Sequence, residues 1–112
     1  MEYKIDATNK ILGRLASEIA MILQGKKSAY YEPRLAGADK VFVANIKKMV
    51  FSGKKLVQKK YYRHTGYMGH LYSKTLQEVF EKDPAKVLRM AVERMLPKNT
   101  LRRKRMLRLE IK

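Results

Sequence analysis

The residues with the most evident chemistry lie in the segment from residue 53 to residue 74. This segment reads GKKLVQKKYYRHTGYMGHLYSK, and it interleaves lysines, an arginine, two histidines and four tyrosines with glycines. Lysine and arginine neutralise phosphates, tyrosine and histidine stack on unpaired bases, and glycine lets backbone N–H groups approach an anion. The pattern therefore favours contact with RNA. The alternative, a half-buried strand, accounts for one residue of the Tyr61–Tyr62 pair, because neighbours in a strand face opposite sides.

A second cluster of cations lies near the end of the chain. It consists of Arg102, Arg103, Lys104, Arg105 and Arg108. On a helix, residues 102, 105 and 108–109 share one face, and the planar guanidinium group suits phosphate. A basic helix can instead lie on anionic lipid, but that needs a broad apolar face, and the few leucines here are scattered. We expect RNA contact, and expect alanine at 102, 103 and 105 to weaken binding without unfolding the domain.

The excess of positive over negative charge lies in two stretches of the chain. The 112 residues include 26 Lys plus Arg and 10 Asp plus Glu, so the net charge is +16. Nine basic residues lie between Lys40 and Gln77 and seven between Arg94 and Leu109, and neither stretch contains an acid. A solvated surface usually mixes both signs of charge. The exclusion of acids over such lengths therefore predicts a polyanionic partner.

The signatures of catalysis are missing. A phosphate-binding loop needs a glycine five residues before its Gly-Lys pair, but that position holds alanine before Gly25-Lys26 and lysine before Gly53-Lys54. The spacing of His64 and His70 suits no metal site. The absence of cysteine excludes thiol nucleophiles, disulfides and Cys-ligated zinc. Asp6 is expected to be a turn or capping residue rather than a catalytic one. We therefore expect no enzyme activity, cofactor or metal.

The chain has the length of one domain, which we place at residues 1–112. Its first residues show no signal pattern. The longest apolar run, Ile19–Leu23, is far shorter than the roughly 18–20 residues of a membrane span. These features and the absence of cysteine favour a cytoplasmic protein without a membrane partner, and the missing phosphate-binding loops argue against a small-molecule substrate.

The elements that must position the basic segments follow from apolar spacing. Leu12, Leu15, Ile19 and Ile22 recur at helical intervals, and Gly25 is expected to end that helix as a left-handed cap. Strands are expected over four ranges, 3–6, 41–45, 56–64 and 109–112. The run at 41–45 is nearly all apolar, as in a parallel-sheet strand covered on both faces.

The second half of the chain is expected to be mostly helical. Thr75 and Glu78 have the spacing of a capping box, and Asp83-Pro84 is a second helix start. Asn99 or Thr100 begins a third, basic helix that runs to about residue 108. This order of elements predicts an α/β fold with a small, mostly parallel sheet.

Gly13 and Arg14 stand at the start of the first expected helix. Glycine weakens a helical turn, which indicates a close backbone approach at Gly13. With Arg14, the helix start could add a phosphate site. Gly13 could equally pack against the sheet, and both interpretations stay open.

Four motifs occur in an order that is typical of one family. They are Asp6-Ala-Thr, Leu12-Gly-Arg-Leu-Ala16, Tyr61-Tyr-Arg-His-Thr-Gly-Tyr67 and Met95-Leu-Pro-Lys-Asn99. Over nearly its whole length, the chain resembles the universal large-subunit ribosomal protein L13 family in its bacterial form. The resemblance implies a three-layer α/β/α domain with a four-stranded parallel sheet. It also implies a structural constituent of the large ribosomal subunit that binds ribosomal RNA early in assembly, supports translation and adjoins neighbouring ribosomal proteins.

The expected RNA contacts combine both basic segments with the start of the first helix. They are Arg14, Lys54, Lys55, Lys59, Lys60, Tyr62, Arg63, His64, Thr65, Gly66, Tyr67, Lys74, Lys98, Asn99, Arg102, Arg103 and Arg105. Two other classes of protein stay open. One is a protein that binds DNA or non-ribosomal RNA, although no helix-turn-helix spacing is visible. The other is a nucleotide- or cofactor-dependent α/β enzyme, since fold does not fix function.

Overall fold

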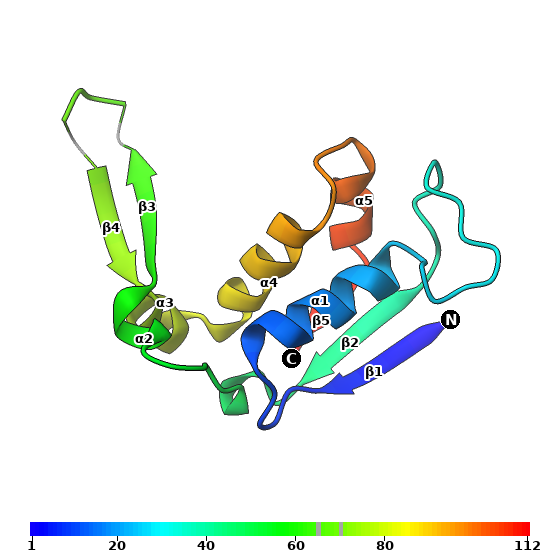
Figure 1. The fold of residues 1–112 in the computed structure, drawn as a ribbon, viewed down its shortest axis with the longest axis horizontal. Coiled ribbons are helices and arrows are strands. Elements are labelled where there is room, and N and C mark those ends of the chain that lie inside the picture. Colours follow the sequence, from blue (N-terminus) through cyan, green and yellow to red (C-terminus); the bar gives the residue numbers. More distant parts are fainter. Residues whose placement is uncertain (65, 70) are drawn as a thin grey trace.

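Three parallel strands form the central sheet of the computed structural model, which describes residues 1–64, 66–69 and 71–112 (Figure 1). The strands β1 (Glu2–Asp6) and β5 (Leu109–Ile111) lie on either side of β2 (Lys40–Ala44). The register pairs Tyr3 with Val41, and Val41 with Leu109. The strands expected at 3–6, 41–45 and 109–112 are thereby confirmed.

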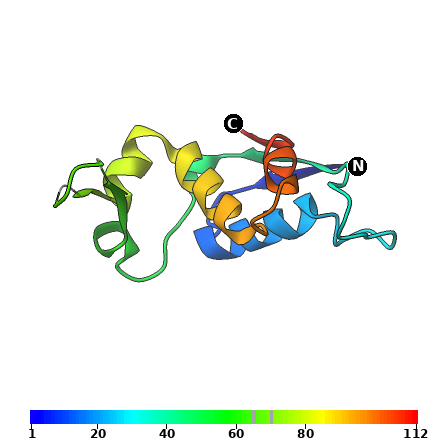
Figure 2. The same cartoon turned by 90° about the horizontal axis from the view of Figure 1, so that it is seen from above.

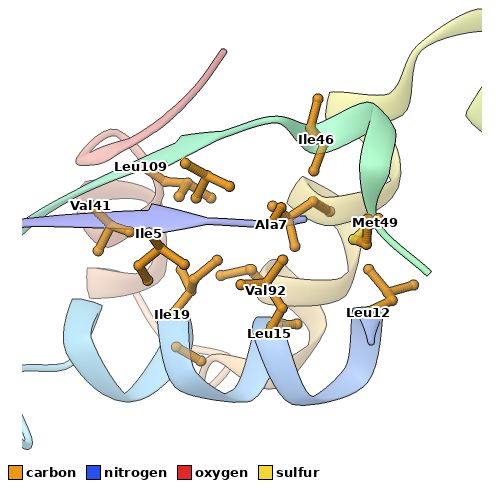
Figure 3. Close-up of a cluster of buried hydrophobic side chains, with 14 of the residues drawn as sticks. Ile5, Ala7, Leu12, Leu15, Ile19, Val41, Ile46, Met49, Val92 and Leu109 are labelled. Carbon is orange, nitrogen blue, oxygen red and sulfur yellow. The ribbon is translucent and has the colours of Figure 1, made fainter. Parts of the chain in front are cut away.

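Two helices cover one face of this sheet. They are α1 (Leu12–Leu23) and α4 (Pro84–Met95), which pack against each other. Figure 3 shows side chains of α1, such as Leu15 and Ile19, pointing toward Ile5 and Val41 of the strands. These residues and Val92 of α4 are almost completely shielded from solvent. The apolar stripe predicted on α1 therefore forms the core of the protein.

The opposite face of the sheet is open. Lys4, Phe42 and Glu110 are neighbours in the strand register and point away from the core, because side chains alternate along a strand. Lys4 and Glu110 are exposed and Phe42 is half-buried. The expectation of a β2 strand covered on both faces is therefore wrong. In the described part of the chain, the main sheet has three parallel strands rather than four, with α1 and α4 on one side.

The expected third strand of that sheet belongs to a separate hairpin. Residues 55–58 form a short helix, α2 (Lys55–Gln58), and β3 (Lys60–His64) pairs antiparallel with β4 (Leu71–Thr75). In Figures 1 and 2 this hairpin projects from one end of the molecule. A strand inside a parallel sheet needs apolar side chains on both faces, and β3 has only Tyr61 packed against the core.

The remaining elements connect the hairpin and the sheet. They are a 3-10 turn, η1 (Ile46–Lys48), and the helices α3 (Leu76–Lys82) and α5 (Leu101–Met106). The predicted caps of α3 and α4 are confirmed: the Thr75 hydroxyl accepts from the Glu78 amide at 3.4 Å, and the Asp83 carboxylate accepts from the Lys86 amide at 3.3 Å. The N-cap residue of α5 is Thr100, and the side-chain oxygen of the preceding Asn99 accepts from the Leu101 amide at 3.0 Å.

Gly25 terminates the first helix as a left-handed cap, as predicted. Gly25 has a φ of +81°, and its amide donates to the carbonyl of Ile22 while the amide of Lys26 donates to that of Met21. These two bonds form a Schellman motif, which satisfies the last carbonyls of a helix. The helix starts without a side-chain cap, because its N-cap residue is Ile11.

Candidate nucleic-acid interface

One face of the β3–β4 hairpin is directed toward the helices. In the hairpin register Arg63 lies opposite Tyr72, and Tyr61 lies opposite Lys74. Residues directly opposite on an antiparallel pair share a face, with Cβ atoms about 4.5–5.5 Å apart. This face therefore alternates cations and aromatic rings, and it presents an arginine and a tyrosine side by side.

The other face of the hairpin is open to solvent. Lys60, Tyr62 and His64 alternate along β3 and are all exposed, and His64 pairs with the exposed Leu71. The hairpin buries little of its surface, so its shape is held by its own backbone pairing. The predicted contacts Lys60, Tyr62, Arg63, His64 and Lys74 thus project together from the body of the protein, where a folded RNA has access.

The end of the hairpin exposes large side chains. The backbone amide of Gly66 donates to Nδ1 of His64 at 3.0 Å, which makes that nitrogen an acceptor. Tyr67 and Met68 are strongly exposed. Thr65, a predicted contact, and His70 lie outside the described residues.

The base of the hairpin gathers positive charge around Tyr61. The Lys59 ammonium lies 5.6 Å from the centre of the Tyr61 ring, and the Arg94 guanidinium lies 5.7 Å from it. Burial raises the pKa of Tyr61 above its usual value. Burial, followed by the charges of Arg94 and Lys55, lowers the pKa of Lys59. Cations that repel one another in this way favour a bound anion.

The second basic zone lies on and before α5. Lys98, Arg103 and Lys104 are exposed, while Arg102 is half-buried and lies 4.0 Å from the Glu93 carboxylate. Asn99 is exposed, although its side-chain oxygen already accepts a hydrogen bond from the Leu101 amide. The exposed cations of this zone leave a positive surface beyond α4.

Comparison with known proteins shows the family of this chain. The model of the family described as ribosomal protein L13 matches residues 1–111. The chain belongs to the ribosomal protein L13 family. Within it, the chain is 50% identical over 107 residues to large ribosomal subunit protein uL13 of Aquifex aeolicus, covering 96% of this chain and 74% of that one. It is also 49% identical over 109 residues to uL13 of Thermotoga maritima, covering 97% and 73%.

A third bacterial relative gives the same result. The chain is 48% identical over 109 residues to large ribosomal subunit protein uL13 of Clostridioides difficile, covering 97% of this chain and 76% of that relative. The resemblance inferred from the four sequence motifs is thereby confirmed. Membership of a family of ribosomal proteins also confirms that this chain is not an enzyme.

The inward face of α5 corrects the prediction for Arg105. Arg105 is 2% exposed, and its Nη2 donates to the carbonyl oxygen of Leu35 at 3.0 Å. The neighbouring Arg108 donates to the carbonyls of Leu23 at 2.8 Å, Asp39 at 2.6 Å and Ala36. The face shared by 102, 105 and 108 therefore turns inward at 105 and 108 and holds the loop of residues 24–39. Arg105 is a structural residue in this protein, and we remove it from the proposed contacts.

The structure tests one of the two interpretations of Gly13 and Arg14 at the start of α1. Arg14 is exposed. A Cβ atom placed on Gly13 would meet none of the described residues within 4 Å, so the interpretation that Gly13 packs against the sheet is wrong. The phosphate site at Gly13 and Arg14 stays a prediction. Lys54 and Lys55, at the start of α2, are exposed as well.

Asp6 has the turn role expected for it. Its Oδ1 accepts from the Thr8 hydroxyl at 2.7 Å, the Thr8 amide at 3.0 Å and the Asn45 side-chain amide at 3.1 Å. These bonds, those from Thr8 first, lower the pKa of Asp6 to about 2. Within the described residues, no group of three or more His, Cys, Asp or Glu could hold a metal ion. No helix in that part of the chain is long and apolar enough to cross a membrane.

Three residues of α4 beside the hairpin were not predicted from the sequence to lie at this site. Lys86 and Met90 of α4 line the groove that the hairpin borders, and Arg94 reaches Tyr61. These three residues are spaced four apart, so they share one face of α4. That spacing was available in the sequence, but nothing local indicated that the face meets the hairpin.

Proposed function

We propose that this chain is a structural constituent of the large ribosomal subunit, which binds large-subunit ribosomal RNA, supports early subunit assembly and translation, and adjoins neighbouring ribosomal proteins in the cytoplasm. The supporting observation is the projecting β3–β4 hairpin, whose exposed cations and tyrosines lie in a stretch without any acid. The relatives are named as large ribosomal subunit proteins, which agrees with this role.

The proposed contacts fall into three groups. The hairpin and the residues before it supply Lys54, Lys55, Lys59, Lys60, Tyr62, Arg63, His64, Thr65, Gly66, Tyr67 and Lys74. The α5 zone supplies Lys98, Asn99, Arg102 and Arg103, and the first helix supplies Arg14. Cations bind phosphates and release counterions, whereas the exposed rings stack on unpaired bases. The bases of duplex DNA are paired and are not free to stack on such rings. The exposed rings therefore favour RNA as the ligand.

The test is the salt dependence of binding to a large-subunit ribosomal RNA transcript. The variant Lys60→Gln/Arg63→Gln removes two hairpin charges, and the control Lys26→Gln/Lys112→Gln removes two charges outside both acid-free stretches. We expect the hairpin variant to reduce the slope of log affinity against log salt by about 1–2, because each phosphate contact contributes roughly 0.7–0.9. The control should keep the wild-type slope.

Two outcomes would contradict the proposal. Equal losses in the hairpin variant and the control would show attraction by net charge alone. A duplex DNA that displaces the ribosomal transcript at equal concentration would favour the DNA-binding alternative.

A further inference from the structure

The groove beside the hairpin is strongly positive. It has a volume of about 440 Å³ and lies between the hairpin, α3 and α4. Arg63 and Lys74 reach it from the hairpin, and Lys86 reaches it from α4. None of the described residues that line it is acidic. A ligand of this groove must therefore carry negative charge.

The groove also offers apolar and aromatic surface. Val79 of α3 and Met90 of α4 are half-buried in its lining. Tyr61 lines it too, but two cations already lie over the Tyr61 ring. Tyr72 is 66% exposed and lies directly opposite Arg63 in the hairpin register. Tyr72 therefore offers an aromatic surface to a ligand, next to a guanidinium group that can stack as well.

We propose that this groove binds one unpaired nucleotide of an RNA chain, with the base stacked on Tyr72 and the phosphate held by Arg63, Lys74 and Lys86. The inference rests on the proposed RNA-binding function and assigns it a specific site. An unpaired nucleotide joins a flat aromatic base to an anionic phosphate, and the groove pairs an aromatic surface with cations in the same way. Its volume lies within the range of pockets that hold small organic ligands.

The key variants change the Tyr72 ring and leave the charges in place. Tyr72→Leu removes the stacking surface, Tyr72→Phe keeps it, and Tyr30→Leu is the matched control, since Tyr30 is 92% exposed on the distant loop 24–39. With a large-subunit ribosomal RNA transcript as the probe, we expect Tyr72→Leu to weaken binding about 5- to 100-fold. Tyr72→Phe and Tyr30→Leu should bind like the wild type.

Salt dependence separates stacking from charge. Because Tyr72 is neutral, Tyr72→Leu should weaken binding by the same factor at every salt concentration. Lys86→Gln should instead reduce the salt slope by about 1. If Tyr72→Leu proves poorly folded in a thermal melt, the salt slope of Lys86→Gln tests the groove assignment instead, since Lys86 is an exposed residue.

Three other outcomes would contradict the groove assignment, the proposed function or both. If the wild type binds the transcript with a steep salt slope but neither Tyr72→Leu nor Lys86→Gln differs from it, the groove assignment is wrong and the proposed function stands. If adenosine or uridine monophosphate displaces the transcript at micromolar concentration, the groove is a site for free nucleotides. If the wild type does not prefer the transcript to duplex DNA, the proposed function fails and the groove assignment fails with it.

Discussion

The guanidinium group of Arg94 lies 5.7 Å from the centre of the Tyr61 ring. This contact joins the two acid-free stretches of the chain, because Tyr61 lies in the first and Arg94 begins the second. Lys59 lies over the same ring at 5.6 Å. The ring therefore brings together two cations that would otherwise repel each other, and it ties the base of the hairpin to α4.

The Arg94–Tyr61 contact should contribute a measurable coupling energy. A double-mutant cycle with Arg94→Met and Tyr61→Leu is expected to give a coupling of about 0.5–1 kcal/mol in the free energy of unfolding. Urea unfolding of the wild type, both single variants and the double variant measures it. Arg89→Met, on the same helix, replaces Arg94→Met in a control cycle and should give no coupling with Tyr61→Leu. Equal coupling in the two cycles would show that the contact has no special role.

The two inward arginines of the C-terminal region should differ in their effect on stability. Arg108 donates to three carbonyl groups, whereas Arg105 donates to one, and its Nε has no hydrogen-bond partner among the residues that the structure describes. Hydrogen bonds to charged groups contribute about 1.5–3 kcal/mol. We expect Arg108→Met to lower the free energy of unfolding by about that amount and Arg105→Met to lower it less.

The exposed Arg103 provides the control for that comparison. Arg103→Met should change the free energy of unfolding by less than about 0.5 kcal/mol, as surface substitutions usually do. In ribosomal RNA binding the order should reverse, with Arg103→Met weakening the affinity and Arg105→Met leaving it near the wild-type value. A larger affinity loss for Arg105→Met at unchanged stability would return Arg105 to the set of contacts.

Much of the fold could be predicted because its signals are local. The spacing of Leu12, Leu15 and Ile19 determines one helix face, Gly25 ends that helix, and Asp83-Pro84 starts α4. Each of these signals involves neighbours within a few residues. Predictions from these signals therefore do not depend on how the rest of the chain folds.

The errors concern features that depend on distant parts of the chain. The residues of β3 form a strand as expected, but the sequence did not indicate that their partner is β4 rather than the central sheet. Arg105 and Arg103 look alike in sequence, and only the packing of α5 against loop 24–39 buries one of them. The groove at Lys86 and Tyr72 likewise needs two elements that are not adjacent in sequence.

Gly13 in α1 and Gly25 just beyond the end of that helix form a matched pair for backbone conformation. In the described part of the chain, a Cβ atom at Gly13 or at Gly25 would meet nothing within 4 Å, but of the two only Gly25 has a positive φ, of +81°. Gly13→Ala should raise the free energy of unfolding by about 0.5–1 kcal/mol, because alanine is favoured over glycine inside a helix. Gly25→Ala should lower it by about 1–2 kcal/mol, the approximate cost of a left-handed alanine. Thermal melts of both variants measure the difference, and a shift of the same sign in both would refute this explanation.

The depressed pKa of Asp6 predicts how stability responds to acid. Its hydrogen bonds with Thr8 and Asn45 lower its pKa from 3.8 to about 2 in the folded protein. The folded state therefore binds the Asp6 proton less readily than the unfolded state. The contribution of Asp6 to the free energy of unfolding is thus complete above about pH 4 and is lost as the pH falls toward 2.

In urea unfolding from pH 7 to pH 2.5, the wild type should be more stable than Asp6→Asn at neutral pH. The difference should shrink below pH 4, because asparagine has no proton to gain. A constant difference across that range would mean that Asp6 is not the group responsible.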